Sequence, residues 1–185
     1  MKKIGIIGRG FVGSAVEFGF PAQTGCEAEV RVYDKDPVKS IHTLKETVNK
    51  SDIIFVSVPT PSNDDGSINI DILDKAISDI EKTNNRTNNI ILIRSTVVPG
   101  TTKKLQKKYK KLNLVFNPEF LTERSAKFDF INQSRFILGG RRKHTKVIAE
   151  LYKWRFGDSV PCIETGFETA EMIKYMNNCY FATKV

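Results

Sequence analysis

Ile4-Gly5-Ile6-Ile7-Gly8-Arg9-Gly10-Phe11-Val12-Gly13 is the most informative stretch of this 185-residue chain. The apolar run at its start is typical of a buried strand, and the glycines after it match G-x-G-x-x-G at the start of a helix. The first glycine allows a tight turn, the second leaves room for a pyrophosphate, and the third lets the helix pack on the strand. The helix N-terminus offers free amides and a partial positive charge. The stretch therefore predicts a dinucleotide-binding turn.

Asp34 follows the second apolar run, Val30–Tyr33, about 20 residues after the last of these glycines. A carboxylate at that position accepts hydrogen bonds from a ribose 2′-hydroxyl and repels a 2′-phosphate. The nearby Lys35 and Lys39 weaken this preference without reversing it. We therefore expect NAD rather than NADP as the cofactor.

Short Val/Ile-rich runs alternate with segments of helical period along the chain. Such runs are typical of strands buried on both faces, and the alternation implies right-handed crossovers. The expected strands are 4–7, 30–33, 53–58, 90–93, 114–116 and 136–138, and the expected helices are 11–20, 37–49, 70–83, 101–111 and 143–156. The sequence predicts an α/β fold with a Rossmann-type, doubly wound, mostly parallel sheet.

The pattern changes after residue 167 to one continuous helical period. From Glu168 to Val185 apolar residues recur at steps of three and four, namely Met172, Tyr175, Met176, Cys179 and Ala182. Neither glycine nor proline ends this segment, and no capping signal follows. We expect an NAD-binding domain over residues 1–166 and the start of a long helix over 167–185, with the chain ending in mid-helix.

The net charge of +8 includes six lysines between Lys103 and Lys111. They interleave with apolar residues as on the solvated face of an amphipathic helix, and no nucleic-acid recognition motif accompanies them. No apolar run approaches the roughly 18 residues of a membrane helix, and no signal peptide is recognisable. We expect no nucleic-acid partner, no membrane partner and a cytoplasmic location.

Cysteine and histidine offer no further chemistry in the sequence. Cys26, Cys162 and Cys179 are widely spaced and form no Cys-x-x-Cys pair, so we expect idle thiols rather than a disulfide or a metal site. Cys179 falls on the apolar stripe of the last helix and is expected to be packed there and inert. His42 and His144 lie among lysines and are expected at the surface.

Three further segments each follow an expected strand, at the sheet edge where ligands bind in open α/β folds. They are Val58-Pro59-Thr60-Pro61, Ser95-Thr96-Val97-Val98-Pro99-Gly100-Thr101-Thr102 and Asn117-Pro118-Glu119-Phe120-Leu121-Thr122-Glu123. Together with the glycine turn and with Ala170-Glu171, Lys174-Tyr175, Asn178 and Ala182-Thr183-Lys184-Val185, they resemble the UDP-glucose/GDP-mannose dehydrogenase family. The resemblance spans nearly the whole chain in the right order.

This resemblance implies an enzyme that oxidises the C6 alcohol of a nucleotide-linked sugar to a carboxylate with two NAD. In the first step the alcohol loses a hydride to the nicotinamide. In the second step a cysteine captures the aldehyde, another hydride leaves, and water hydrolyses the thioester. The resemblance also implies a homodimer built on the long helix in the full-length enzyme.

The resemblance further implies roles for individual residues. Asp34 and Lys39 would contact the adenosine ribose. The cofactor cleft would be lined by Pro59, Thr60, Ser95 and Thr96, with Glu123 also close to the cofactor and Thr96 close to the reacting centre. The sugar would be flanked by Glu119 and Glu123, with Glu123 as general base, and held by the backbone of Phe120 and Leu121. Lys184 would stabilise the oxyanion and bind substrate.

The residues by themselves leave simpler interpretations open. Glu119 and Glu123 also fit acids that complement a helix N-terminus. Thr96 also fits an ordinary turn residue, and Lys184 a solvated lysine at the end of a helix. Arg135 resembles a substrate-proximal arginine of the family only weakly.

The chain departs from the family pattern in two respects. The family's catalytic cysteine, an asparagine four positions after Lys184 and the sugar-nucleotide domain all belong beyond Val185, so we expect this chain alone to be inactive. In addition, only 17 residues separate Asp34 from Asp52, where relatives carry a longer segment. We therefore expect a sheet that is reduced on that side.

Two alternatives remain at the level of sequence. A β-hydroxyacid dehydrogenase-like domain shares the fold and a helix lysine, but its glycine turn usually reads Gly-x-Gly-x-Met-Gly, unlike Phe11-Val12 here. A standalone NAD-binding module without catalysis would bind the cofactor and turn nothing over.

Overall fold

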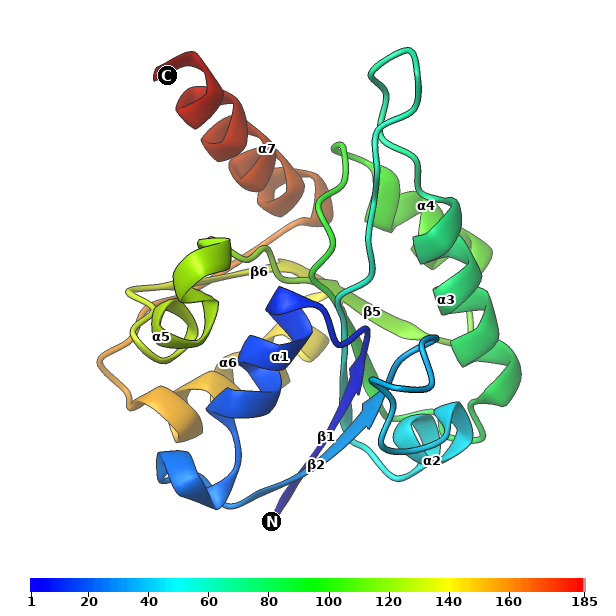
Figure 1. The fold of residues 1–185 in the computed structure, drawn as a ribbon, viewed down its shortest axis with the longest axis vertical. Helices are drawn as coiled ribbons and strands as arrows, with labels where there is room; N and C mark the ends of the chain where they lie inside the picture. Colours follow the sequence, from blue (N-terminus) through cyan, green and yellow to red (C-terminus); the bar gives the residue numbers. More distant parts are fainter. Residues whose placement is uncertain (185) are drawn as a thin grey trace.

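The computed structural model describes residues 1–184, so Val185 of the predicted long helix lies outside the described residues. The strands are β1 (Lys2–Ile7), β2 (Ala28–Tyr33), β3 (Ile53–Val56), β4 (Ile90–Ile93), β5 (Asn113–Phe116), β6 (Phe136–Gly140) and β7 (Cys162–Thr165). They form one sheet in the order β2-β1-β3-β4-β5-β6-β7 (Figure 1). Only β5 and β6 pair antiparallel. The predicted doubly wound, mostly parallel sheet is confirmed.

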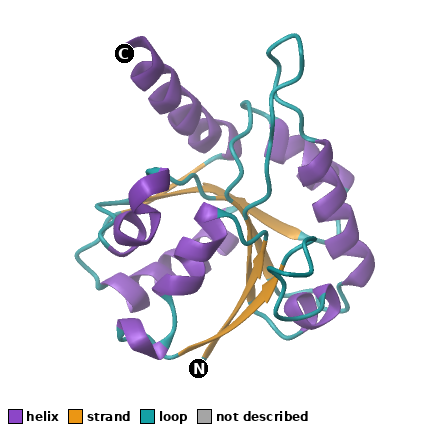
Figure 2. Ribbon diagram, in the orientation of Figure 1, coloured by secondary structure: helices purple, strands orange, loops and turns teal. Residues whose placement is uncertain are grey.

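Helices cover both faces of this sheet, as Figure 2 shows. They are α1 (Phe11–Gly19), α2 (Leu44–Asn49), α3 (Asp71–Thr83), α4 (Thr101–Lys108), α5 (Ala126–Ile131), α6 (Arg142–Phe156) and α7 (Phe167–Lys184), with short 3-10 turns η1 (Ala22–Thr24) and η2 (Glu123–Ser125). One apolar core lies under α1, α5 and α6, and a second lies under α2, α3, α4 and the start of α7. The central strands are buried on both faces, as their uninterrupted Val/Ile runs predict.

The second helix is shorter than predicted. The sequence indicated helix from residue 37, whereas α2 begins at Leu44. The residues before it turn back onto β2, where the amides of Ile41 and His42 both donate to the carbonyl oxygen of Val32. Thr43 and Glu46 then form a reciprocal capping box that fixes the start of the helix. Helix α2 is shorter than predicted because this capping box ends it at its N-terminal side and keeps residues 37–43 out of the helix.

Strand β2 forms one edge of the sheet. In the described residues no strand lies outside it, which agrees with the short segment between Asp34 and Asp52. The outward-facing amide of Val32 is instead satisfied by Nδ1 of His42, at 3.2 Å. A short tethered loop therefore covers the carboxyl end of β2, which lies beside the glycine turn.

Helix α7 packs on the sheet with its first half only. Gly139 of β6 allows this close approach, because a Cβ on it would lie 2.6 Å from the Cβ of Ala170. The second half projects away from the domain (Figure 1) and exposes apolar side chains, including Met176 and Phe181. One helix thus has a buried segment and an unpartnered segment.

Two expectations about single residues are wrong. His144 is buried rather than at the surface, because the first turn of α6 packs its imidazole inward. Cys179 is exposed rather than packed, because it lies on the projecting half of α7. No helix among residues 1–184 combines the length and the apolar character needed to cross a bilayer.

Candidate functional site

The glycine turn has the geometry that a pyrophosphate requires. Gly8 has φ +92°, and a Cβ there would lie 2.4 Å from the carbonyl oxygen of Ser57. Gly13 has no room either, since its Cβ would lie 1.9 Å from the carbonyl oxygen of Gly8. Gly10, in contrast, faces open space. The two crowded glycines build the turn, and the open one leaves its surface free for a ligand.

The start of α1 presents free amides at this turn. The first intrahelical hydrogen bond runs from the amide of Ser14 to the carbonyl oxygen of Gly10, at 2.9 Å. No side chain caps the helix, and its first turn contains no acid. The amides of Phe11 and Val12 therefore have no intrahelical acceptor, and they fit a phosphate group.

Asp34 links this turn to the end of β2. Its Oδ2 accepts the amide of Arg9 at 2.5 Å, and its Oδ1 accepts the amide of Asp36 at 2.8 Å. Each carboxylate oxygen retains a second lone pair, so the group can still accept from a ribose hydroxyl. The carboxylate is therefore oriented before any ligand arrives.

A cavity of about 690 Å³ opens beside Asp34, within the size range of small-molecule sites. Gly8, Asp34, Lys35 and Pro59 form part of its rim. Its walls are mostly apolar: Tyr33 and Val58 come from the expected strands, whereas Leu44, Ile72 and Ala76 were not indicated by any motif. Helical spacing places Ile72 and Ala76 on one face of α3. No sequence signal marks these α3 residues as part of a site, and an exposed isoleucine such as Ile72 is common on protein surfaces.

The loops after β3 and β4 are tied together. Thr60 Oγ1 donates to the carbonyl oxygen of Thr96 at 2.8 Å, and Ser95 Oγ donates to that of Val58 at 2.7 Å. These bonds hold the Pro59-Thr60 and Ser95-Thr96 segments in one rigid edge above the parallel strands. Four of the predicted cleft residues are thus brought together.

A buried ion pair lies at the loop after β5. Lys174 Nζ of α7 donates to the carbonyl oxygen of Glu119 at 2.6 Å and to its Oε1 at 3.0 Å. The two side chains are only 7% and 9% exposed. Glu119 Oε2 also accepts the amide of Leu121 at 2.8 Å, and the Lys174 ammonium lies 5.5 Å from the ring centre of Phe120. An ammonium and a carboxylate are therefore fixed at the edge of the sheet where ligands bind.

Glu171, one helical turn before Lys174, fastens α7 to α4. Its carboxylate accepts the amides of Gly100 at 2.6 Å and Thr102 at 2.7 Å. Burial raises the pKa of this carboxyl group, and the bonds from Thr102 and Gly100 oppose that rise. The clamp fixes the rotation of α7 and with it the direction of Lys174.

Lys184 does not join this arrangement. It is exposed at the far end of α7, about 15 Å along the axis from Lys174, with its ammonium 5.1 Å from the ring centre of Tyr180. Lys174 lies in a segment that carries the family resemblance, but the resemblance placed the substrate role on Lys184. The signal that could have found Lys174 is its position three residues after Glu171 on the inward helix face.

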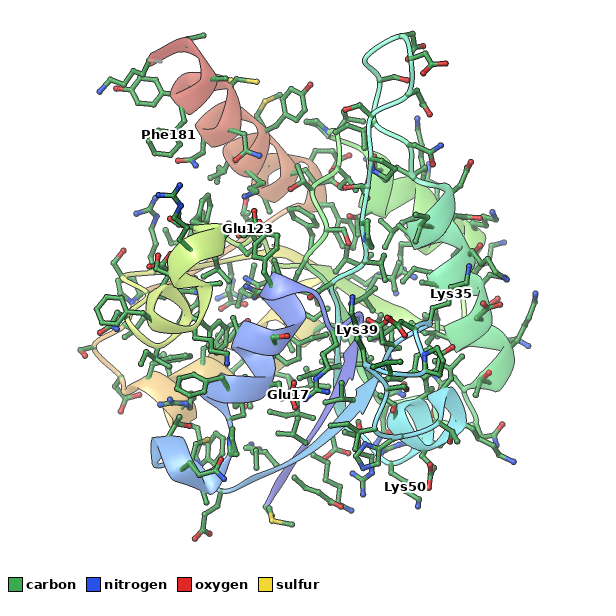
Figure 3. All side chains as sticks on the ribbon, in the orientation of Figure 1. Glu17, Lys35, Lys39, Lys50, Glu123 and Phe181 are labelled. Atoms are coloured by element: carbon green, nitrogen blue, oxygen red, sulfur yellow. The ribbon has the colours of Figure 1, made fainter. Side chains whose placement is uncertain are left out.

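Two other predicted residues lie at the margins. Glu123 is exposed and borders a cavity of about 390 Å³ with Phe11 and Ser14 of α1, close to the glycine turn (Figure 3). Lys39 is exposed on the α1 side of β2, outside the large cavity, with its ammonium 3.9 Å from Asp36 Oδ2. Lys35, not Lys39, lines the cavity next to Asp34.

Two of the three thiols are made less reactive by burial. Burial raises the pKa of Cys26 and of Cys162, which disfavours their thiolates. Residues 1–184 contain no cluster of side chains suited to a metal ion. The described site therefore offers a nucleotide cleft and a lysine–glutamate pair.

Comparison with known proteins identifies the family. The sequence model of the UDP-glucose/GDP-mannose dehydrogenase family, NAD binding domain, matches residues 27–155. The chain belongs to this family. The predicted family and the predicted NAD cofactor are confirmed. The matched residues include Asp34 and the Asn117–Glu123 segment, whereas the glycine turn and α7 lie outside the matched range.

Similar proteins extend the match over the whole chain. A UDP-glucose 6-dehydrogenase of Haloferax volcanii is 30% identical over 99% of this chain and 52% of its own length. An uncharacterised protein of Methanocaldococcus jannaschii is 33% identical over 98% of this chain and 24% of its own. The crystal structure of a GDP-mannose dehydrogenase from Pseudomonas aeruginosa, solved as a ternary complex, superposes with a TM-score of 0.84 at 24% identity, covering all of this chain and 50% of that one. This family member thus spans about half the length of such dehydrogenases.

Proposed function

We propose that this chain is the NAD-binding part of a nucleotide-sugar 6-dehydrogenase, which oxidises a sugar C6 alcohol to a carboxylate in two NAD-dependent steps. The observation that carries the proposal is the buried pair of Lys174 and Glu119 beside the cofactor loops. A module that only bound NAD would have no need of an ammonium held in this place. UDP-glucose and GDP-mannose, named by the family and the relatives, are the first candidate substrates.

At the cofactor end, the glycine turn and the amides of Phe11 and Val12 hold the pyrophosphate, and Asp34 accepts from the adenosine ribose. The adenine fits the apolar part of the 690 Å³ cavity. Pro59, Thr60, Ser95 and Thr96 line the path toward the nicotinamide. Lys35, on the cavity rim, is assigned the ribose-side contact that the sequence suggested for Lys39.

At the reacting end, we assign to Lys174 the role that the resemblance implied for Lys184. Its ammonium donates to the C6 oxygen as negative charge develops there, and Glu119 keeps that ammonium in position. Phe120 and Leu121 offer backbone groups to the sugar. Thr96 lies on the neighbouring loop, within the same edge.

The first oxidation removes one hydride and one proton from the C6 alcohol. Bound NAD supplies the hydride acceptor. Glu123, an exposed carboxylate between the glycine turn and α5, is assigned the role of general base. It accepts the proton of the C6 hydroxyl directly or through a water molecule. The second, thiol-dependent oxidation is assigned to the cysteine that the family resemblance implies beyond Val185, because burial disfavours the thiolates of Cys26 and Cys162 and because Cys179 lies on the projecting half of α7.

We also propose that the projecting half of α7 forms a homodimer contact in the full-length enzyme. Met176 and Phe181 are each 58% exposed there, although large apolar side chains favour burial. Sedimentation of the full-length protein with Phe181→Asp tests this contact. A monomeric variant supports the contact, and an unchanged oligomer rejects it.

The native gene product, isolated with all of its residues, tests the proposed activity. It should bind NAD and form NADH when UDP-glucose or GDP-mannose is added. NADH formation that requires the sugar supports the dehydrogenase. NAD binding without NADH formation from any nucleotide sugar supports the second candidate, an NAD-binding module without catalysis, which only the nucleotide cleft favours.

A further inference from the structure

Arg9 occupies the variable position between the first two glycines of the turn, and each nitrogen of its guanidinium donates a hydrogen bond. Its Nε and Nη2 donate to the two carboxylate oxygens of Glu17 on α1, each at 2.7 Å. Its Nη1 donates to the carbonyl oxygen of Lys39 at 3.2 Å. The two side chains are 31% and 25% exposed, so this bidentate pair is partly shielded from water.

The backbone and the side chain of Arg9 point to different places. Its amide contacts Asp34 Oδ2 at 2.5 Å, at the proposed ribose position. Its guanidinium lies instead in a groove of about 590 Å³ on the α1 side of β2, together with Glu17 and Lys39. Figure 3 shows Glu17 and Lys39 on that side and Lys35 toward α3. An arginine next to the ribose site is thus turned away from it.

Charged side chains lie on both sides of the turn. The large cavity is lined by Asp34, Asp36 and Asp79 with Lys35 and Lys75, and the groove by Glu17 with Arg9, Lys39 and Lys127. An arginine near the ribose position is the group that accepts a 2′-phosphate in NADP-binding domains of this fold. Glu17 is the one carboxylate among the residues that line the groove, so removing its charge would leave the Arg9 guanidinium without an ionic partner there.

We propose that Glu17 is a specificity-determining residue of the cofactor site, which holds the Arg9 guanidinium away from the ribose and so maintains the preference for NAD over NADP. The inference rests on the proposed contact of Asp34 with the ribose. Glu17 touches no cofactor atom in this arrangement. It acts through Arg9.

The test compares the dissociation constants of NAD and NADP, measured by calorimetric titration of the purified 185-residue chain. In Glu17→Gln the ratio of the NADP constant to the NAD constant should fall about tenfold, as expected for one new hydrogen bond to a charged group. Glu150→Gln removes the same charge from an exposed position on α6 and should leave the ratio unchanged. The double variant Arg9→Met/Glu17→Gln should return the ratio to that of the wild type.

An unchanged ratio in Glu17→Gln overturns the proposal. A fall that persists in the double variant also overturns it, because the effect is then one of general charge rather than of Arg9. If Glu17→Gln fails to fold, Glu17→Asp, whose shorter carboxylate cannot reach both guanidinium nitrogens, must give a smaller fall in the same direction. A wild-type chain that binds no NAD at all would reject the proposed function itself, which distinguishes the two failures.

Discussion

Lys174 of α7 and Glu119 of the loop after β5, 55 residues apart in the chain, form an ion pair with both side chains buried. The ammonium also donates to the backbone carbonyl oxygen of Glu119, so two bonds fix its direction. Each group needs the other to remain buried in its charged form, because removing either one would leave an unpaired charge in the interior.

Comparing Lys174→Met with Lys184→Met should distinguish a lysine that takes part in catalysis from one that only contributes surface charge. In the full-length enzyme, Lys174→Met should lower kcat/KM for the nucleotide sugar by about 100-fold or more, the cost of losing a donor to a developing oxyanion. Lys184→Met, ten residues later on the same helix, should leave the rate unchanged. The measurement is NADH formation with both variants in parallel. Equal losses in the two, or a loss only in Lys184→Met, would return the role to Lys184.

The same pair predicts a stability effect. Lys174→Met should reduce the free energy of unfolding by about 3 kcal/mol, because Glu119 is left buried without its partner. Adding Glu119→Gln should recover part of that loss, since the unpaired charge is then gone. Urea denaturation of the 185-residue chain gives both values. A double variant less stable than Lys174→Met would show that the unpaired Glu119 carboxylate is not the cause of the lost stability.

Two glycines of the turn should respond differently to alanine. Gly10→Ala should fold normally, since its Cβ meets nothing within 4 Å, but bind NAD at least about tenfold more weakly, because the methyl group occupies the pyrophosphate surface. Gly13→Ala should melt at lower temperature, because its Cβ would lie 1.9 Å from the carbonyl oxygen of Gly8. Thermal unfolding and NAD titration of both variants distinguish the two roles. Undiminished NAD binding by Gly10→Ala would place the pyrophosphate elsewhere.

Asp34→Ala should weaken NAD binding about tenfold, the value of a hydrogen bond to a charged acceptor. NADP should be affected less, since the repulsion of its 2′-phosphate is lost together with the carboxylate. Asp36→Asn is the matched control, because it removes a charge from the same loop while Asp34 remains. Titration of both nucleotides checks the prediction, and unchanged NAD affinity in Asp34→Ala would reject the ribose contact.

His144 should make the fold sensitive to acid. Burial, with Lys143 and Arg141 nearby, lowers the pKa of this imidazole below its ordinary value of about 6.5. As the pH falls below that value the unfolded chain takes up the proton first, so the contribution of neutral His144 to stability is present above it and lost below it. The difference in unfolding free energy between wild type and His144→Gln should therefore shrink from pH 7.5 toward pH 5.5, two values chosen about one pH unit either side of the ordinary pKa. A difference independent of pH would contradict the lowered pKa.

The sequence alone determined the parts of this protein that depend on neighbouring residues. The apolar runs specified six of the seven strands, since a strand buried on both faces needs continuous apolar side chains. Gly8-Arg9-Gly10-Phe11-Val12-Gly13 specified the turn, because its backbone conformation and close contacts exclude other residues locally. The predicted role of Asp34 at the ribose depended only on its place after the second strand, about 20 residues beyond the last glycine of the turn.

The tertiary structure decided what depends on distant residues. Lys174 and Lys184 both lie on α7, and although its spacing from Glu171 places Lys174 on the same helix face, the sequence does not say what that face meets. Gly139, which lets the helix approach β6, and Glu171, which clamps it to α4, set its rotation and turn Lys174 toward Glu119. In the same way, the large cavity is formed where residues of α3 and residues at the end of β2 face one another across it. Burial and charge pairing act through space, and a linear pattern contains neither.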